Sequence, residues 1–266
     1  MKKNVSLSVL IPILIISLSL LSGCTKNTTQ ATLSKENDTL YQVSTINSLL
    51  AGNYDGLQTI GKLKEKGDIG IGTFDMLDGE LVMIDKKVYQ VKATGQVIEV
   101  EDSIKAPFAA VTFFDKDITK ESIPISNFKS LTQVLDNLIV SKELFYAFRI
   151  DGTFKYVKTR SVPKQNKPYQ VLSEVTKNQP TFEYRDVTGS LIGFWCPEYV
   201  GGVNVPGYHL HFISDDRTKG GHLLEISFDK ASINIDVTDS FNMALSPESV
   251  SGAITDIQKE IDKVEK

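Results

Sequence analysis

Every histidine of the chain lies in the segment 207–222, Gly-Tyr-His-Leu-His-Phe-Ile-Ser-Asp-Asp-Arg-Thr-Lys-Gly-Gly-His. This segment constrains the fold most strongly because it predicts a β-hairpin. Side chains alternate along a strand, so His209 and His211 lie on the same face. The stretch 214–221 is typical of a loop, since its two glycines can adopt left-handed backbone angles. A strand returning from His222 then pairs with the first one. We therefore expect two antiparallel strands that bring three imidazoles together.

Three converging imidazoles predict a metal site. Catalytic zinc is commonly held by three protein ligands, which leaves one coordination position for water or substrate. A ligand set made only of nitrogen favours zinc among the common divalent metals. The alternative interpretation is a cluster of histidines that acts as a pH-sensitive surface.

The chain from residue 40 onwards is rich in β patterns. Asp78-Gly79 between two apolar runs is a strong hairpin signal. We expect strands at 70–74, 80–84, 88–91, 97–100, 109–114, 144–150, 154–160, 188–195, 226–228 and 233–237, besides the histidine hairpin. The pair 144–150 and 154–160 is expected to form a hairpin around Asp151-Gly152. Helices are expected at 41–51, 127–140 and 249–264, from capping residues and apolar spacing.

Many strands with few, segregated helices predict an α+β fold. We expect a β-rich subunit with mixed sheets and a few peripheral helices. Residues 40–266 are long enough for one domain of two lobes, and we place the break between the lobes near residue 180. Strands that begin with glycine recur near Gly70 and Gly189, which indicates an internal duplication.

The first 24 residues have the pattern of an export signal, with two lysines followed by the apolar run 5–21. The run from Leu21 to Cys24 resembles the lipobox of bacterial lipoproteins, in which the cysteine is lipidated. We therefore expect a protein anchored through Cys24 on the extracytoplasmic side of a membrane. An uncleaved transmembrane helix is the alternative, but the run falls short of the ~20 residues that span a bilayer. Residues 25–39 are polar and predict a flexible tether.

Charge and cysteine content exclude several classes of protein. The formal net charge is −4 and no basic stripe occurs, which argues against a nucleic-acid partner. With Cys24 lipidated, Cys196 has no disulfide partner. Its apolar neighbours favour a small core residue. A nucleophilic role is less favoured because no further histidine is present to activate it.

A metal held by neutral histidines keeps its charge and suits carbonyl polarisation or water activation. It needs a carboxylate for proton transfer and a cation for an anionic substrate. Glu80 opens an apolar strand, so it is either partly buried or a solvated turn residue. Arg160 and Arg149 lie in the two paired strands, and spacing does not choose between them. The glycine spacing at 67–72 does not fit a dinucleotide loop. The chain lacks His-Glu-x-x-His and the glutamate that follows the histidines of a cupin.

Several ordered segments resemble the alpha-acetolactate decarboxylases, over about residues 41–265. The segments that carry the resemblance are Tyr41–Thr45, Gly70–Phe74, Leu77–Leu81, Phe145–Ala147, Arg149–Gly152, Thr159–Arg160, Gly207–Phe212 and Gly220–His222. The resemblance implies conversion of 2-acetolactate to acetoin and CO2 by a homodimer with a β-rich, two-part subunit.

The resemblance also implies roles for particular residues. Zinc would be held by the histidines at 209, 211 and 222. The active site would include Thr73, Glu80, Arg160 and a glutamate near the C-terminus, for which Glu265 is the best match and Glu260 the alternative. Zinc would chelate the ketone and hydroxyl oxygens of the substrate and stabilise an enediolate. Arg160 would hold the departing carboxylate, and Glu80 or Glu265 would protonate the enediolate carbon with a raised pKa.

Two other functions remain open from the sequence. One is a zinc-dependent hydrolase at the cell surface, and the other is a zinc-binding lipoprotein without catalytic activity. Three histidines without a clear fourth ligand favour an open, catalytic site over the second of these.

Overall fold

The computed structural model describes residues 38–247 and 256–265. Within these residues, a seven-stranded sheet has the order β15-β1-β8-β3-β4-β5-β6. Its strands are β1 (Thr39–Val43), β3 (Ile69–Thr73), β4 (Glu80–Ile84), β5 (Lys87–Val91), β6 (Val97–Glu99), β8 (Phe108–Thr112) and β15 (Ser240–Ala244). The sheet is mixed, because β1 pairs with β15 in parallel and with β8 antiparallel.

A second, six-stranded sheet carries the histidine hairpin and has the order β11-β12-β13-β10-β14-β9. Its strands are β9 (Ile118–Glu121), β10 (Phe145–Arg160), β11 (Thr181–Cys196), β12 (Gly207–Ser214), β13 (Gly220–Ser227) and β14 (Ala231–Thr238). Strand β10 also pairs with β11, so β10, β11, β12 and β13 close into a ring. A small ladder joins β2 (Gln58–Thr59) to β7 (Lys105–Ala106).

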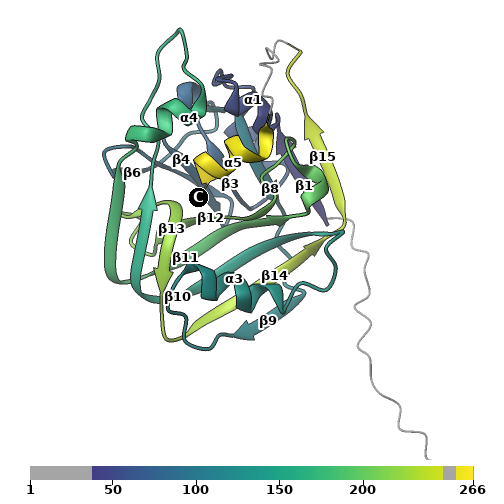
Figure 1. Ribbon diagram of the computed structural model, residues 1–266, viewed down its shortest axis with the longest axis vertical. Helices are drawn as coiled ribbons and strands as arrows, with labels where there is room; N and C mark the ends of the chain where they lie inside the picture. Colours follow the sequence, from purple (N-terminus) through teal and green to yellow (C-terminus); the bar gives the residue numbers. More distant parts are fainter. Residues whose placement is uncertain (1–37, 248–255, 266) are drawn as a thin grey trace, which may run out of the picture. The chain divides into compact units, whose positions relative to one another are not determined.

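The helices are short and lie beside the sheets. They are α1 (Ile46–Leu50), α2 (Ile60–Lys64), α3 (Phe128–Asp136), α4 (Leu172–Val175) and α5 (Ile257–Glu265), with 3₁₀ turns at Asp75–Leu77, Thr176–Asn178 and Glu198–Val200. Figure 1 shows α1, α4 and α5 together near the same end of the strands, and α3 against the six-stranded sheet. The three helices share a buried apolar cluster that includes Leu49, Leu172 and Ile261.

The two sheets pack face to face through apolar side chains. One buried cluster joins Ile71 and Val82 of the seven-stranded sheet to Ile192, Phe194 and Ile213 of the six-stranded sheet. This contact brings the hairpin β3–β4 opposite the hairpin β12–β13, which places the active-site candidates of both hairpins side by side.

The α+β class with mixed sheets and few helices agrees with the sequence prediction. The predicted helix at 41–51 is only partly right. Residues 39–43 instead form β1, because they pair with two neighbouring strands. The helix begins at Ile46 and is capped by Thr45, whose side chain accepts a hydrogen bond from the backbone of Ser48.

The predicted hairpin around Asp151-Gly152 is wrong. Residues 145–160 form one continuous strand, β10. A Cβ atom on Gly152 would lie 2.9 Å from the Cβ of Ala231, so this glycine permits the close approach of β14 rather than a turn. The carboxylate of Asp151 accepts hydrogen bonds from Arg149 and Ser190, which places this residue within the sheet.

Several other expectations differ in their bounds. The helix predicted at 127–140 spans Phe128–Asp136, with Asn127 as its N-cap. Helix α5 begins at Ile257, and the earlier part of the predicted helix lies outside the described residues. The division into two lobes with a break near residue 180 stays a prediction; β10 and β11, on either side of residue 180, pair with each other. The internal duplication stays a prediction.

The export signal, Cys24 and the tether up to residue 37 lie outside the described residues. In the part of the chain that the structure describes, none of the helices combines the length and the apolar character needed to cross a bilayer.

Candidate active site

The histidine hairpin forms as predicted, from β12 and β13. His211 and His222 are direct partners in the antiparallel ladder. His209 lies on the same face as His211, two residues earlier, and the ring centroids of His209 and His222 are 4.9 Å apart. The ring of His211 is oriented from the other sheet: its Nδ1 donates a hydrogen bond to the carbonyl oxygen of Leu81, at 2.8 Å. This bond leaves the Nε2 lone pair of His211 directed into the site.

The three imidazoles fit a metal ion. Their candidate ligand atoms all lie within 4.8 Å of one another, and no other cluster of this kind occurs among the described residues. Among these residues, no group hydrogen bonds to His211 Nε2, although the atom is buried. Burial lowers the pKa of His209 to about 3 and holds the pKa values of His211 and His222 well below the usual range, with the charge of Arg160 adding to the effect. Metal ligation requires neutral imidazoles of this kind.

Glu80 and Thr73 come from the β3–β4 hairpin, where they are cross-strand partners. Glu80 is only 7% exposed, and its Oε2 lies 3.7 Å from His211 Nε2. Burial raises the pKa of Glu80 to about 8; the negative charge of Glu265 adds to this shift and Arg160 opposes it. The Thr73 hydroxyl donates to the carbonyl of Gly79 at 2.7 Å. The structure therefore places Glu80 in the interior, so it is a buried residue and not a solvated turn residue.

Arg160, at the end of β10, is the arginine of the site. It pairs with His222 across the β10–β13 ladder, and its Nη2 lies 3.1 Å from His222 Nε2. The residue is 5% exposed, and among the described residues its Nε has no hydrogen-bond partner. Arg149 instead forms ion pairs with Asp85 at 2.6 Å and Asp151 at 3.0 Å, outside the pocket. Of the two arginines between which the sequence did not choose, Arg160 is therefore the one that lines the pocket.

Helix α5 brings Glu265 to the histidines. Glu265 Oε2 lies 3.6 Å from the Nε2 atoms of both His209 and His222, and 3.9 Å from Arg160 Nη2. Burial raises the pKa of Glu265, and the charge of Arg160 opposes this shift. Glu260 points elsewhere, forms an ion pair with Lys263 and does not line the pocket. The structure therefore brings Glu265, and not Glu260, into the site.

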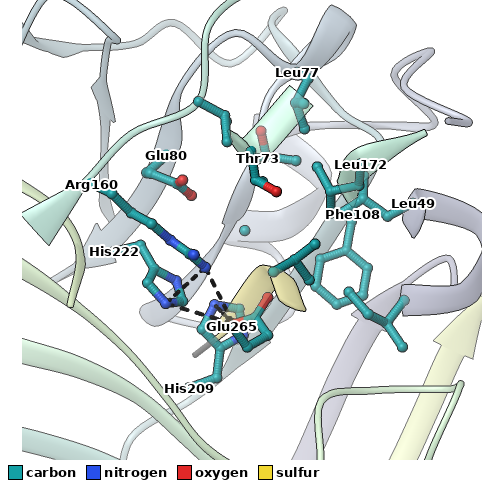
Figure 2. A pocket seen from close by; sticks show the side chains of 15 residues that line it. Leu49, Thr73, Leu77, Glu80, Phe108, Arg160, Leu172, His209, His222 and Glu265 are labelled. Carbon is teal, nitrogen blue, oxygen red and sulfur yellow. Dashed lines mark hydrogen bonds and ion pairs between the residues drawn. The ribbon is translucent and has the colours of Figure 1, made fainter. Parts of the chain in front are cut away.

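These side chains line one pocket that has a polar and an apolar wall (Figure 2). The empty space is about 430 Å³, part of which is open to solvent. The polar wall includes Thr73, Glu80, Arg160, His209, His222 and Glu265, and His211 lies beside it, with its Nε2 3.7 Å from Glu80 Oε2. The apolar wall consists of Ile46, Leu49, Leu77, Phe108, Val162, Leu172 and Val264. No motif in the sequence predicts this wall, because its residues come from separate segments of the chain.

The alpha-acetolactate decarboxylase model matches residues 40–252 of the chain. The chain belongs to this family. It is 46% identical to the alpha-acetolactate decarboxylase of Methanosarcina mazei, over 86% of this chain and 81% of the relative. It is 40% identical to that of Brevibacillus brevis, over 92% of this chain and 90% of the relative.

Solved structures of the alpha-acetolactate decarboxylase family share the fold. The crystal structure of the Bacillus subtilis strain 168 enzyme superposes with a TM-score of 0.82 at 37% identity, covering 85% of this chain and 99% of that one. A Staphylococcus aureus protein of unknown function, similar to alpha-acetolactate decarboxylase, gives a TM-score of 0.80 at 32% identity and covers 85% of this chain and 98% of its own. The resemblance noted in the sequence is thereby confirmed.

Cys196 lies apart from this alpha-acetolactate decarboxylase pocket. It is 2% exposed and packs in the cluster between the sheets. Burial raises the pKa of its thiol. This environment favours a core residue over a nucleophile, as the apolar sequence around it indicates.

Proposed function

We propose that the chain decarboxylates 2-acetolactate to acetoin and CO2, with zinc held by His209, His211 and His222. The observation that carries the proposal is the convergence of three clustered, neutral imidazoles, a buried arginine, the buried Glu80 and the mostly covered Glu265 at one pocket. Membership of the alpha-acetolactate decarboxylase family supports the substrate and the reaction. The nitrogen donor set and the buried, unpaired Nε2 of His211 support zinc.

Zinc bound there would supply a Lewis acid for the carbonyl and hydroxyl oxygens of the substrate. The remaining chemistry belongs to side chains of this chain, and each can be assigned from its environment.

Arg160 binds the carboxylate of the substrate in this proposal. It is a permanent cation that is almost fully buried, and its Nε has no hydrogen-bond partner among the described residues. A planar guanidinium can donate two parallel hydrogen bonds to a carboxylate. This pairing orients the bond that breaks and holds the carboxylate until CO2 leaves.

Glu80 donates the proton. A pKa of about 8 keeps this carboxyl protonated near neutrality, because burial disfavours its ionised form. When the bond from C2 to the carboxylate breaks, the electron pair stays on the substrate and CO2 departs. The proton of Glu80 then forms the new C–H bond at C2, and solvent restores the proton, so one proton is consumed per turnover. Glu265, whose pKa is also raised, is the alternative donor.

Thr73 accepts a hydrogen bond from the hydroxyl group of the substrate. Its own hydroxyl proton is engaged by the carbonyl of Gly79, so only its lone pairs are available to the pocket. The apolar wall receives the two methyl groups of the substrate and restricts the access of water.

We also propose that the enzyme is exported, lipidated at Cys24 and anchored on the extracytoplasmic side of the membrane, and that it forms a homodimer. The apolar run before Cys24 supports the first part, and the family resemblance supports the second. A Cys24→Ala variant should lose the lipid by mass spectrometry and leave the membrane fraction. A protein that stays bound to the membrane without lipid would contradict the anchor.

The reaction is tested by giving purified residues 25–266 racemic 2-acetolactate and measuring acetoin and CO2. We expect both products in equal amounts. Hydrolysis of ester or amide substrates without acetoin formation would favour the surface hydrolase. Bound zinc without any turnover would favour a non-catalytic zinc-binding lipoprotein.

A further inference from the structure

Two buried hydroxyls flank Arg160 and bond to two different strands. Thr159 and Ser161 are both fully buried. The Thr159 hydroxyl donates to the carbonyl of Gly220, at 2.8 Å, and so holds β10 against β13 within the six-stranded sheet. The Ser161 hydroxyl donates to the carbonyl of Val91, at 2.7 Å. Because Val91 belongs to β5, this second bond crosses from one sheet to the other.

The bond from Ser161 reaches the strand segment that lies beside Glu80. Val91 is the cross-strand partner of Glu80 in the β4–β5 ladder. The contact there is tight, since a Cβ atom on Gly79 would lie 2.3 Å from the Val91 oxygen. On the other side, the bond from His211 to the carbonyl of Leu81 joins the residue after Glu80 to the histidine hairpin. Two hydrogen bonds between the sheets therefore border Glu80.

We propose that Ser161 is a positioning residue, whose hydroxyl sets the placement of Arg160 relative to Glu80. This inference rests on the proposed function, in which the two residues act on the same substrate molecule from different sheets. Arg160 and Ser161 are neighbours in the chain, so a hydrogen bond at Ser161 fixes the backbone that carries the arginine. A displacement of about 1 Å between catalytic groups can lower the rate about 100-fold.

Loss of the Ser161 hydrogen bond should affect substrate binding and the chemical step differently. The carboxylate can pair with Arg160 in the ground state even when β10 has moved slightly. Alignment of the Glu80 proton with C2 is needed only in the transition state, so its loss lowers kcat rather than raising KM. Poorer alignment also lets protons arrive from either face of C2, which lowers the enantiomeric excess of acetoin.

The test compares Ser161→Ala with Ser190→Ala in residues 25–266 with zinc bound. Ser190 is a matched control, because it lies in the same sheet, is 3% exposed and donates a 2.6 Å hydrogen bond to Asp151, away from the pocket. We expect Ser161→Ala to lower kcat per bound zinc about 10- to 100-fold, with KM and zinc content unchanged and a lower enantiomeric excess. Ser161→Thr, which keeps the hydroxyl, restores most of kcat.

Ser190→Ala should lower the melting temperature by a similar amount but leave kcat, KM and enantiomeric excess as in the unaltered chain. Equal kcat values per zinc for the two alanine variants would overturn the positioning role. If the unaltered chain forms no acetoin, the proposed function itself fails and this inference falls with it. If the unaltered chain is active and the two variants behave alike, only the role of Ser161 is wrong.

Discussion

The histidine hairpin and helix α5 both deliver polar groups to the pocket, but they are held in different ways. In the hairpin, each group is fixed by the register of paired strands, with His222 opposite both His211 and Arg160. Helix α5 has only nine residues and makes no strand pairing. It is held by the burial of Ile261 and Val264, which lie in the cluster shared with α1 and α4.

This difference indicates that the hairpin and α5 support different parts of the site: the hairpin holds the histidines, and α5 holds Glu265. A helix of nine residues is marginal in isolation, so the position of Glu265 depends on how well α5 packs. The strand register that brings the three histidines together does not depend on that packing. We therefore expect the metal-binding half of the site to survive changes in α5, and changes in the hairpin to abolish both metal binding and activity.

The largest expected effect is that of His211→Ala. This change removes one of the three proposed zinc ligands, together with its hydrogen bond to the carbonyl of Leu81. We expect zinc to be lost and kcat/KM to fall about 1000-fold or more, since a bound metal contributes several kcal/mol to the transition state. Metal content by mass spectrometry and acetoin formation measure the two effects. A His211→Ala variant that still makes acetoin at the original rate would contradict the proposed mechanism.

Next in size is the change Glu265→Gln, which alters α5 and leaves the strands of the hairpin unchanged. We expect kcat to fall about 10-fold with zinc content unchanged, which is less than the ~100-fold or more that follows from loss of the proton donor itself, because Glu80 remains as the donor. Glu260→Gln is the control on the same helix, because Glu260 pairs with Lys263 and does not line the pocket. Equal activities for the two variants would show that Glu265 has no role in the chemistry.

A smaller effect is expected from Ile261→Ala, which weakens the packing of α5. Ile261 is 2% exposed, and truncation of a buried isoleucine to alanine costs about 2–5 kcal/mol. We expect faster proteolysis within α5 and a moderate loss of kcat, with zinc still bound. Lys259→Ala, at an exposed position of the same helix, is the control. Loss of zinc in Ile261→Ala would mean that the hairpin and α5 are not independent.

The smallest effect is on the pH dependence of stability in the zinc-free protein, where Glu265 of α5 and His209 of the hairpin act in opposite directions. The pKa of Glu265 is raised on folding, so its contribution to stability is lost as pH rises above the ordinary value of 4.5. The pKa of His209 is lowered from 6.5 to about 3, so its contribution is lost as pH falls through that window. Melting temperatures measured across pH should show that Glu265→Gln reduces the loss of stability at higher pH, while the part due to the raised pKa of Glu80 and the loss at lower pH remain. An unchanged profile would contradict the burial of Glu265.

The contrast between the hairpin and α5 also explains how much of the site could be predicted from the sequence. The hairpin followed from the alternation at His209 and His211 and from the glycines before His222, because these features are local. Strand β10 was misjudged, since Asp151-Gly152 has a turn pattern while Gly152 in fact permits the close approach of β14. Its continuity puts Arg149 and Arg160 in one strand, at positions that only the pairing with His222 distinguishes.

The position of α5 could be expected only from the family resemblance. Contacts between residues far apart in the chain bring Glu265 to the histidines, and no local pattern encodes them. The apolar wall could not be predicted from a local pattern either, because Leu49, Phe108 and Leu172 come together only once the sheets and helices have packed.

In the proposed mechanism, acetoin formation depends on a zinc ion held by the histidine hairpin. The most direct test removes the metal from purified residues 25–266 with a chelator and then titrates zinc back while measuring acetoin from 2-acetolactate. We predict that activity disappears with the metal and returns in proportion to bound zinc, up to one ion per chain. Full activity in the metal-free protein would contradict a zinc-dependent reaction.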